Sequence, residues 1–296
     1  MIYTLTLNPS VDYYMDFNSV RLGALNRSSG ERCVVGGKGI NVSRMLNALG
    51  LKSTVIAAVG GFTGQEIKEC IISEGLDFIP LPVSGTTRIN VKLNDGTELN
   101  GSGAMADVNT VKALFTALDN VVKGDTVVLS GSVCSGFDKN IYARIIAMLN
   151  SKGVYTVLDA DGSLLKNALE SRPRLIKPNS SELGALFNAD IEDAAAAEKY
   201  ALKLVDSGIE NVLVSLGDKG ALYVSGEGTY FCKAPQVSAV TTVGAGDCAL
   251  AGFIYALESG MSVKQCTAFA VACGSARVNT GIFADRAVIN EIFDKL

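Results

Sequence analysis

Histidine is absent from this sequence of 296 residues. The absence excludes Ser-His-Asp and Cys-His catalysis, zinc sites that use imidazole ligands, and a histidine acting as general base. Any proton transfer must therefore depend on a carboxylate or a lysine.

Paired cysteines and long apolar runs are also missing. The seven cysteines are odd in number and form no CxxC pair, which favours reduced thiols of a cytosolic protein. They are Cys33, Cys70, Cys134, Cys232, Cys248, Cys266 and Cys273. No stretch approaches the roughly 18 apolar residues of a membrane helix, and the N-terminus, MIYTLTLNPS, has no basic segment before an apolar one. We therefore expect a soluble, cytoplasmic protein.

Charge is sparse and nearly balanced. There are 26 basic and 30 acidic residues, which give a net charge of −4 and a pI near 5.1. This balance argues against broad binding of nucleic acid or anionic membranes, while it permits a local basic pocket for a phosphate. The hydrophobic fraction of 48% is that of an ordinary globular protein.

Strand-like and helix-like patterns alternate along most of the chain, which predicts an α/β fold. For example, a strand over 54–59 precedes a helix that a capping box of Thr63 and Glu66 would open. Near the end, a hairpin is expected over 221–233, followed by two helices that close the chain.

One segment departs from this alternation. Residues 87–93 alternate polar and apolar side chains, which predicts a strand that turns into a hairpin. Its polar face carries Arg88, Asn90 and Lys92. Because a hairpin alone is rarely stable, we expect residues 11–35 and 84–102 to form a small sheet together. Such a sheet would cover one end of the α/β core as a lid over a cleft.

The strongest chemical signal is the string TVGAGD over 242–247, which leads into an apolar helix. Glycines at a helix start leave N–H groups free at the positive end of the helix dipole, and these groups can bind an anion. Asp247 falls in the first turn of this helix. On this motif alone, complementing the helix dipole is a more common role for such an aspartate than catalysis.

Two other glycine clusters lie at element junctions. GGKGIN over 36–41 opens a helix and offers Lys38 and Asn41 to a polyol or a phosphate, although a tight turn with a solvated lysine explains it equally well. SLGDKG over 215–220 follows a strand, where ligands of open α/β sheets bind, and is otherwise a simple turn.

A fourth motif, KPNSSE over 177–182, lies between these clusters in the sequence and enters a helix. Its Asn179 and Glu182 are three residues apart, so they are suited either to a magnesium ion held through water or to a helix N-cap. The cap is the more common role.

A dinucleotide site is disfavoured. The GxGxxA pattern occurs at 244–249 and at 101–106, but no βαβ unit and no acidic residue about 20 positions on follow the first of these. A Walker A motif is absent as well, because Gly39 follows Lys38 where Ser or Thr is required.

Taken together, the motifs match a known family. They are TLNPSVD (6–12), GGKGINVSR (36–44), GGFTG (60–64), TRINVK (87–92), IKPNSSEL (176–183), VSLGDKG (214–220) and TVGAGD (242–247). In this order the sequence resembles the PfkB (ribokinase-like) sugar kinases, and GGFTG and TRINVK point to their fructose-phosphate branch. The resemblance implies a ribokinase-like three-layer α/β/α sandwich with a small β-sheet lid. It also implies a single kinase domain over 1–296 that pairs lid to lid in a homodimer.

The resemblance also implies residue roles. Asp247 would be the catalytic base, and Gly244, Ala245 and Gly246 would supply the backbone anion hole. The sugar would be bound by Asp12, Gly37, Lys38, Asn41 and Ser132, and its phosphate by Arg88 with Lys92 or Arg27. The nucleotide would lie along Ser215, Leu216, Gly217, Asp218, Lys219 and Gly220, with Lys177 and Gly246 close to it. Asn179 and Glu182 would organise Mg²⁺.

The activity implied is phosphorylation of a ketohexose monophosphate by ATP and Mg²⁺, with fructose 1-phosphate converted to fructose 1,6-bisphosphate. The alternatives are tagatose 6-phosphate or another sugar, a dinucleotide oxidoreductase, and a non-catalytic sugar-phosphate sensor. Phosphoryl transfer depends mainly on positioning and charge neutralisation, so it needs no histidine.

The chain departs from the family pattern at several places: GSGA over 101–104 replaces the expected Gly-Pro-Gly-Pro, Thr241 stands where Asn or Asp is usual, and two further departures bear on the site. The loop SGSVCSG over 130–136 lacks the two prolines that the branch usually has, and Cys248 replaces a common serine. Because Cys248 lies at a helix N-terminus directed at an anion site, it is expected to have a low pKa.

Overall fold

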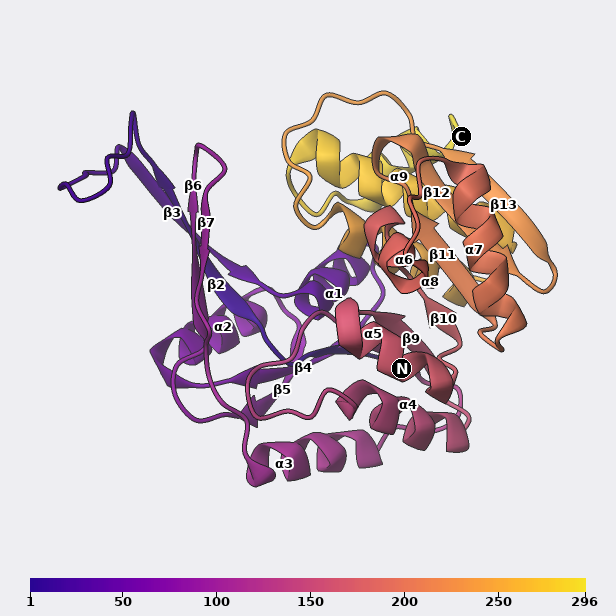
Figure 1. Ribbon diagram of the computed structural model, residues 1–296, viewed down its shortest axis with the longest axis horizontal. Coiled ribbons are helices and arrows are strands. Elements are labelled where there is room, and N and C mark those ends of the chain that lie inside the picture. Colours follow the sequence, from indigo (N-terminus) through magenta and orange to yellow (C-terminus); the bar gives the residue numbers. More distant parts are fainter.

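A computed structural model describes residues 1–296. Its centre is a sheet of nine strands, seven of them parallel (Figure 1). The strands are β1 (Ile2–Thr6), β4 (Thr54–Val59), β5 (Asp77–Pro82), β8 (Thr126–Ser130), β9 (Tyr155–Asp159), β10 (Leu175–Ile176), β11 (Asn211–Ser215), β12 (Gly220–Ser225) and β13 (Gly228–Lys233). Their order is β13-β12-β11-β10-β9-β8-β1-β4-β5. The last two in sequence, β12 and β13, are antiparallel and form the expected hairpin.

Helices cover both faces of this sheet. One layer contains α1 (Lys38–Ala48), α2 (Gly61–Ser73), α8 (Ala245–Glu258), α9 (Val263–Thr280) and α10 (Arg286–Phe293). The other contains α3 (Val108–Asp119), α4 (Ile141–Ser151), α5 (Gly162–Ala168), α6 (Ser180–Phe187) and α7 (Ala194–Asp206). Alternate residues of β8 belong to opposite cores, Leu129 to one and Val128 to the other. The three-layer α/β/α sandwich is confirmed.

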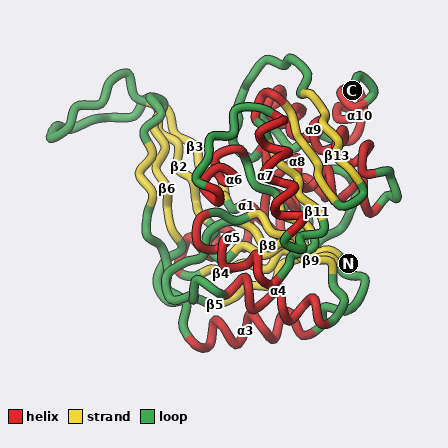
Figure 2. Tube along the Cα trace, turned by 45° about the vertical axis from the view of Figure 1, so that its right-hand side comes forward, coloured by secondary structure: helices red, strands yellow, loops and turns green.

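A second, separate sheet forms the lid. It consists of β2 (Ser10–Asp16), β3 (Gly30–Gly36), β6 (Arg88–Leu93) and β7 (Glu98–Asn100), in the order β3-β2-β6-β7. The lid projects from one side of the sandwich, and the β2–β3 connection extends farthest from it (Figures 1 and 2). Asp12 of β2 pairs with Asn90 of β6, so the polar residues of the two strands share one face.

Two local expectations were wrong. The chain closes with three helices rather than two, because α9 ends at Gly281 in a left-handed conformation and Asp285 caps a separate α10. The Thr63–Glu66 capping box does not form either, since α2 begins at Gly61 with no side-chain cap. Thr63 Oγ1 instead donates to the carbonyl of Thr87, which ties α2 to the base of the lid.

The helices are too short or too polar for a bilayer: none of them meets the length and hydropathy needed to cross a membrane.

Candidate active site

Unpaired polar groups gather where the central strands end. Thr6, Ser130 and Asp159 are the last residues of β1, β8 and β9 and lie in register with one another. Each is buried and has a side-chain oxygen that accepts or donates no hydrogen bond. The one other buried side-chain atom without a hydrogen bond is Oδ1 of Asn90, in the lid. Because buried polar atoms are normally paired, these orphans mark the lid-side end of the sheet as a place where ligand or water groups bind.

Asp247 lies in the first turn of α8, beside free backbone donors. Gly244 is the N-cap, with a left-handed φ of 80°. The N–H groups of Gly244, Gly246 and Asp247 donate to no protein acceptor, whereas the N–H of Ala245 lies 3.3 Å from the carbonyl oxygen of Thr242. A helix N-terminus with free N–H groups favours an anionic ligand.

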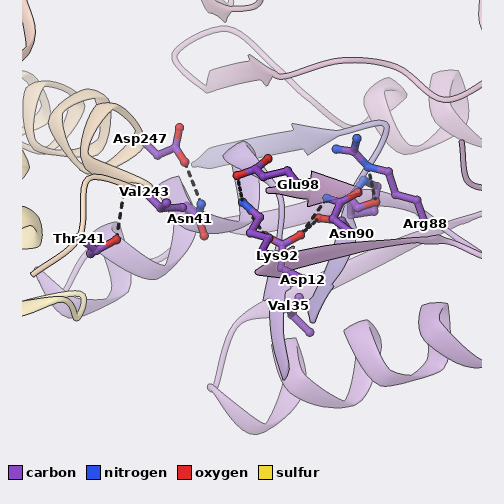
Figure 3. A network of polar contacts seen from close by, with 12 residues as sticks. Asp12, Val35, Asn41, Arg88, Asn90, Lys92, Glu98, Thr241, Val243 and Asp247 are labelled. Carbon is purple, nitrogen blue, oxygen red and sulfur yellow. Dashed lines mark hydrogen bonds and ion pairs between the residues drawn. The ribbon is translucent and has the colours of Figure 1, made fainter. Parts of the chain in front are cut away.

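Asn41 reaches this helix start from α1. Its Nδ2 donates to Asp247 Oδ2 at 2.8 Å (Figure 3). Burial, and next the negative charge of Asp159, raise the pKa of Asp247 to about 6, against the opposing effects of Asn41, Lys177 and Lys38. Asp247 is therefore ionised at neutral pH, yet it is a stronger base than an ordinary aspartate.

Asp159 organises the cationic side of the site, and sequence reasoning missed it. Its carboxylate is fully buried; Oδ1 lies 3.1 Å from Lys38 Nζ and Oδ2 lies 3.3 Å from Lys177 Nζ. The second contact is an ion pair without hydrogen-bond geometry, so Oδ2 keeps its acceptor capacity. Burial lowers the pKa of Lys38, but the carboxylates of Asp159, Glu182 and Asp247 outweigh it and raise the pKa above the usual lysine value. Lys38 therefore remains charged at the edge of the sheet.

The GGKGIN turn places Lys38 and Asn41 at this edge. Gly37, the N-cap of α1, has φ of 143°, and a Cβ on it would come 2.9 Å from Thr6 Cγ2. Only glycine can adopt this positive φ and leave room for the Thr6 side chain without strain. As a result α1 begins close against β1 with its first turn directed at Asp159 and Asp247.

The polar face of the lid carries a linked group of side chains (Figure 3). Asp12 Oδ1 accepts from Asn90 Nδ2 at 2.9 Å. Lys92 Nζ lies 3.8 Å from Asp12 Oδ2 and 3.2 Å from Glu98 Oε1. The charge of Lys92 is thus already compensated by two carboxylates.

Arg88, in contrast, is bound only by backbone carbonyls. Its Nη2 donates to Asn8 at 3.0 Å and its Nε to Pro9 at 3.4 Å, and it forms no ion pair. Ser132 is close by, because its Oγ accepts from Asn8 Nδ2 at 3.1 Å. Arg27 belongs to the β2–β3 connection and makes no hydrogen bond or ion pair with this group. The connection itself lies at the outer end of the lid (Figure 2). Arg88 therefore has no carboxylate in ion-pair contact, and the charge of Asp12 acts on it only from a longer distance.

The turn over 215–220 and the KPNSSE motif lie next to each other. The N–H of Ser215 donates to the carbonyl of Pro178 at 3.0 Å, and Ser215 bridges to Asn179. The turn connects β11, which ends at Ser215, to β12, which begins at Gly220. Leu216 follows β11, and a short 3₁₀ turn over Gly217–Lys219 contains Asp218. Lys219 Nζ donates to the carbonyl of Glu192 and so fastens the turn.

Asn179 and Glu182 form a helix cap. Asn179 Oδ1 accepts from the N–H of Glu182 at 2.8 Å, and Glu182 Oε2 accepts from the N–H of Asn179 at 2.9 Å. The cap interpretation is confirmed. Oε1 of Glu182 and Oδ2 of Asp159 accept no hydrogen bond, although they lie 4.0 Å from Lys38 Nζ and 3.3 Å from Lys177 Nζ, respectively, and no cluster of three metal-ligating side chains is present. This set suits Mg²⁺, which commonly takes one or two carboxylates together with phosphates and water.

The expectation of a reactive Cys248 was wrong. Its side chain is fully buried among α8 and α9. Burial, and next the charge of Asp247, raise the pKa of its thiol, and Arg277 opposes them only in part. The first turn of α8 directs Asp247 toward the site and Cys248 into the core.

Comparison with known proteins identifies the family. The model of the pfkB family of carbohydrate kinases matches residues 5–281. This chain belongs to that family. It is 41% identical over 278 residues to 1-phosphofructokinase of Bacillus subtilis. That alignment covers 93% of this chain and 92% of the relative. It is also 34% identical to D-tagatose-1-phosphate kinase of Klebsiella oxytoca, in an alignment that covers 93% of this chain and 91% of the relative.

A solved structure agrees over the whole chain. Phosphofructokinase-2 from Escherichia coli, in complex with substrates and products, superposes with a TM-score of 0.91 at 29% identity and covers 100% of this chain and 99% of that one. The protein is a carbohydrate kinase, a phosphotransferase of the 1-phosphofructokinase type, and membership of the pfkB family implies that it uses ATP.

The pairing of Asp159 with two lysines predicts a stability effect. Asp159→Asn leaves the buried Lys177 without its anionic partner, so we expect the free energy of unfolding to fall by about 3 kcal/mol in urea denaturation. Glu210→Gln is the matched control, because it breaks the exposed Arg174–Glu210 pair at 3.3 Å and should cost less than about 1 kcal/mol. Equal effects of the two variants would contradict the prediction.

Proposed function

We propose that the enzyme transfers the γ-phosphoryl group of ATP to fructose 1-phosphate and forms fructose 1,6-bisphosphate. The observation that carries the proposal is the buried Asp247 carboxylate beside the free N–H groups of α8, at the sheet edge that the lid covers. Relatives named 1-phosphofructokinase, at 41% and 37% identity, support the choice of sugar phosphate. Residues 1–296 would act as one kinase domain.

The sugar phosphate would be bound between the lid and the sandwich. Arg88 has no carboxylate in direct contact and could bind a phosphate, whereas Lys92 would act mainly by holding Asp12. Asp12 and Asn41 offer a carboxylate and an amide to sugar hydroxyls, with Gly37, Lys38 and Ser132 beside them. Arg27 would reach a sugar phosphate only by movement of the lid or from a second protomer.

Asp247 would act as the general base. It would accept the proton of the sugar hydroxyl that attacks the γ-phosphorus, and its pKa of about 6 suits that exchange at neutral pH. The N–H groups of Gly244 and Gly246 would receive the negative oxygens of the moving phosphoryl group, with Lys38 and Lys177 adding positive charge. Ala245 would contribute mainly by holding the turn.

The nucleotide would extend from Gly246 and Lys177 along residues 215–220. Mg²⁺, held by Glu182 Oε1 and Asp159 Oδ2, would neutralise charge on the nucleotide phosphates. Asn179 would support it by fixing Glu182 through the cap.

A homodimer through the lid is part of this proposal. Lid side chains such as Leu99, Ile89 and Val34 are exposed, which is typical of a surface that a second copy covers. Sedimentation equilibrium of the purified enzyme measures this directly, and a monomer at micromolar concentration would contradict it.

The rival substrates are other ketohexose phosphates. A relative is named D-tagatose-1-phosphate kinase, so tagatose 1-phosphate joins the tagatose 6-phosphate expected above. Family membership removes the oxidoreductase and sensor alternatives.

A coupled ADP-release assay tests the substrate. It compares fructose 1-phosphate, tagatose 1-phosphate, tagatose 6-phosphate and fructose 6-phosphate with ATP and Mg²⁺. We expect kcat/KM to be highest for fructose 1-phosphate. A preference of more than about tenfold for any other sugar phosphate, which is about 1.4 kcal/mol in transition-state binding, would refute the assignment.

Asp247→Asn tests the base. The variant keeps the size of the side chain, so kcat should fall by about 10² to 10⁴ while the KM values change little. In the unaltered enzyme, kcat/KM should decrease below pH about 6, because protonation removes the base. The variant should lack this acid limb. If it keeps more than a third of kcat, Asp247 is not the base.

Arg88→Ala tests the phosphate contact. A charge-assisted hydrogen bond contributes about 1.5–3 kcal/mol, so KM for the sugar phosphate should rise about 10- to 100-fold, with KM for ATP nearly constant. Arg174→Ala removes an exposed arginine far from the lid along the chain and is the control. Equal weakening of both substrates would assign Arg88 to the structure of the lid instead.

A further inference from the structure

Arg277, near the C-terminal end of α9, makes an unusual set of contacts. Its Nε donates to the carbonyl of Val243 at 3.0 Å and its Nη1 donates to the carbonyl of Gly281 at 2.7 Å. Its guanidinium carbon lies 4.6 Å from the centre of the Phe283 ring. It forms no ion pair with a carboxylate, although arginine in folded proteins commonly binds one. The positive charge is therefore held by carbonyl oxygens and a ring face.

These contacts end at the edge of the anion site. Val243 immediately precedes Gly244, the N-cap of α8. A Cβ built on Gly244 would lie 3.6 Å from Arg277 Nε, 3.6 Å from Asn41 Nδ2 and 3.9 Å from Asp247 Oδ2. The guanidinium thus lies next to the same glycine as Asn41 and the Asp247 carboxylate.

The bond to Val243 acts on one particular peptide group. The carbonyl that accepts from Arg277 belongs to the amide whose N–H is that of Gly244, and this N–H has no protein acceptor. Hydrogen bonding at the carbonyl of an amide polarises the group and strengthens its N–H as a donor. It also fixes the direction in which the N–H points, and donors fixed in advance stabilise the charge that develops in a transition state.

The turn has few other restraints. Residues 234–244 contain no helix or strand, and Gly244 has a left-handed φ of 80°. The approach to the turn is tied to α9 by the carbonyl of Val278, which accepts from Val240 at 2.8 Å and from Thr241 at 3.4 Å. Within the turn, the N–H of Val243 donates to Thr241 Oγ1 at 3.2 Å and the N–H of Ala245 lies 3.3 Å from the carbonyl oxygen of Thr242. Arg277 adds the contact from α9 that is closest to the free N–H groups, so the end of α9 supports this turn from outside.

We propose that Arg277 is a positioning residue for phosphoryl transfer: by binding the carbonyls of Val243 and Gly281 it orients and polarises the Gly244 amide toward the moving phosphoryl group. The inference rests on the proposed function of the Asp247 site. Arg277 contacts neither the sugar nor the adenine in this scheme, so its effect belongs to the chemical step rather than to the binding of either substrate.

Arg277→Met removes the charge and both hydrogen bonds but keeps a long side chain. We expect kcat to fall about 10- to 100-fold, as when a group that positions reactants is lost, and both KM values to stay within about threefold. Guanidinium chloride, at millimolar concentrations below the denaturing range, should restore at least part of kcat in this variant and leave the unaltered enzyme unchanged. A role in folding alone would not respond to guanidinium.

Arg286→Met is the matched control, since Arg286 is an exposed arginine of the same helix layer that contacts the ring of Tyr255. It should retain kcat and show no response to guanidinium. If Arg277→Met does not fold, Arg277→Lys, which keeps the charge and one donor, takes its place, and a reduced kcat at constant KM is again expected. A kcat within threefold of the unaltered enzyme, or a loss that guanidinium leaves unchanged, overturns the inference.

The kcat and KM values of each variant are compared with those of the unaltered enzyme on the sugar phosphate that this enzyme turns over fastest. Asp247→Asn is measured in parallel. An error in the proposed substrate then shows in the unaltered enzyme, and an error in the proposed base shows in Asp247→Asn. Neither changes the comparison between Arg277→Met and Arg286→Met.

Discussion

The ion pairs of Asp159 with Lys38 and Lys177 are the constraint on which the site depends. A fully buried carboxylate is costly unless cations compensate it, and here the two lysines come from α1 and from the strand end before α6. Asp159 therefore holds two separate motifs at the end of β9. After burial, its negative charge is the next cause that raises the pKa of Asp247, so one buried carboxylate both holds the two lysines and affects the titration of Asp247.

The parallel sheet explains why these groups meet. Carboxyl ends of parallel strands lie at one edge, and the helices that follow begin there with free N–H groups. In this protein α1, α6 and α8 all start at that edge, and each start carries one of the motifs singled out in the sequence. The lid is attached to the same edge, because β2 follows β1 after only three residues and Thr63 of α2 is bound to Thr87 at the base of β6. The fold thus places the polar face of the lid at the same edge as the start of α8, where the proposed function needs the sugar-phosphate contacts.

Features that depend on local sequence could be predicted. The alternation of strands and helices, the lid strand with Arg88 and Lys92 on one face, and the position of Asp247 in a first helical turn all follow from patterns a few residues long. Asp159 could not be found in this way. A single aspartate at the end of a strand carries no sign of partners 121 and 18 residues away. Only the packing of α1 on β1 and β8 and the pairing of β10 with β9 bring these partners close. The only available signal was a charged residue ending an otherwise apolar strand.

Cys248 and Arg277 are two further residues whose environment could not be predicted from local sequence. A helix N-terminus suggests a reactive thiol, but the rotation of α8 about its axis decides which residue faces the site, and that rotation is set by packing against α9. Arg277 belongs to none of the motifs, because its effect arises where the end of α9 meets the turn before α8. The residues proposed to contact substrates are recognisable in the sequence, whereas those that hold them in place depend on tertiary structure.

Charge couples the two substrates. The positive charges of Lys38 and Lys177 lower the pKa of Asp247. An anionic phosphoryl group at the α8 N-terminus would partly neutralise these charges and so weaken their effect on Asp247. It would also add negative charge close to Asp247. Both effects raise the pKa of the carboxylate, because a nearby anion favours the protonated form. Under the proposed function, a phosphoryl group in the anion site would therefore favour the protonated form of Asp247, whereas Mg²⁺ at Asp159 and Glu182 would offset the Asp159 charge and favour the ionised form. The metal and the two lysines would together keep the carboxylate able to accept a proton while the nucleotide phosphates are bound.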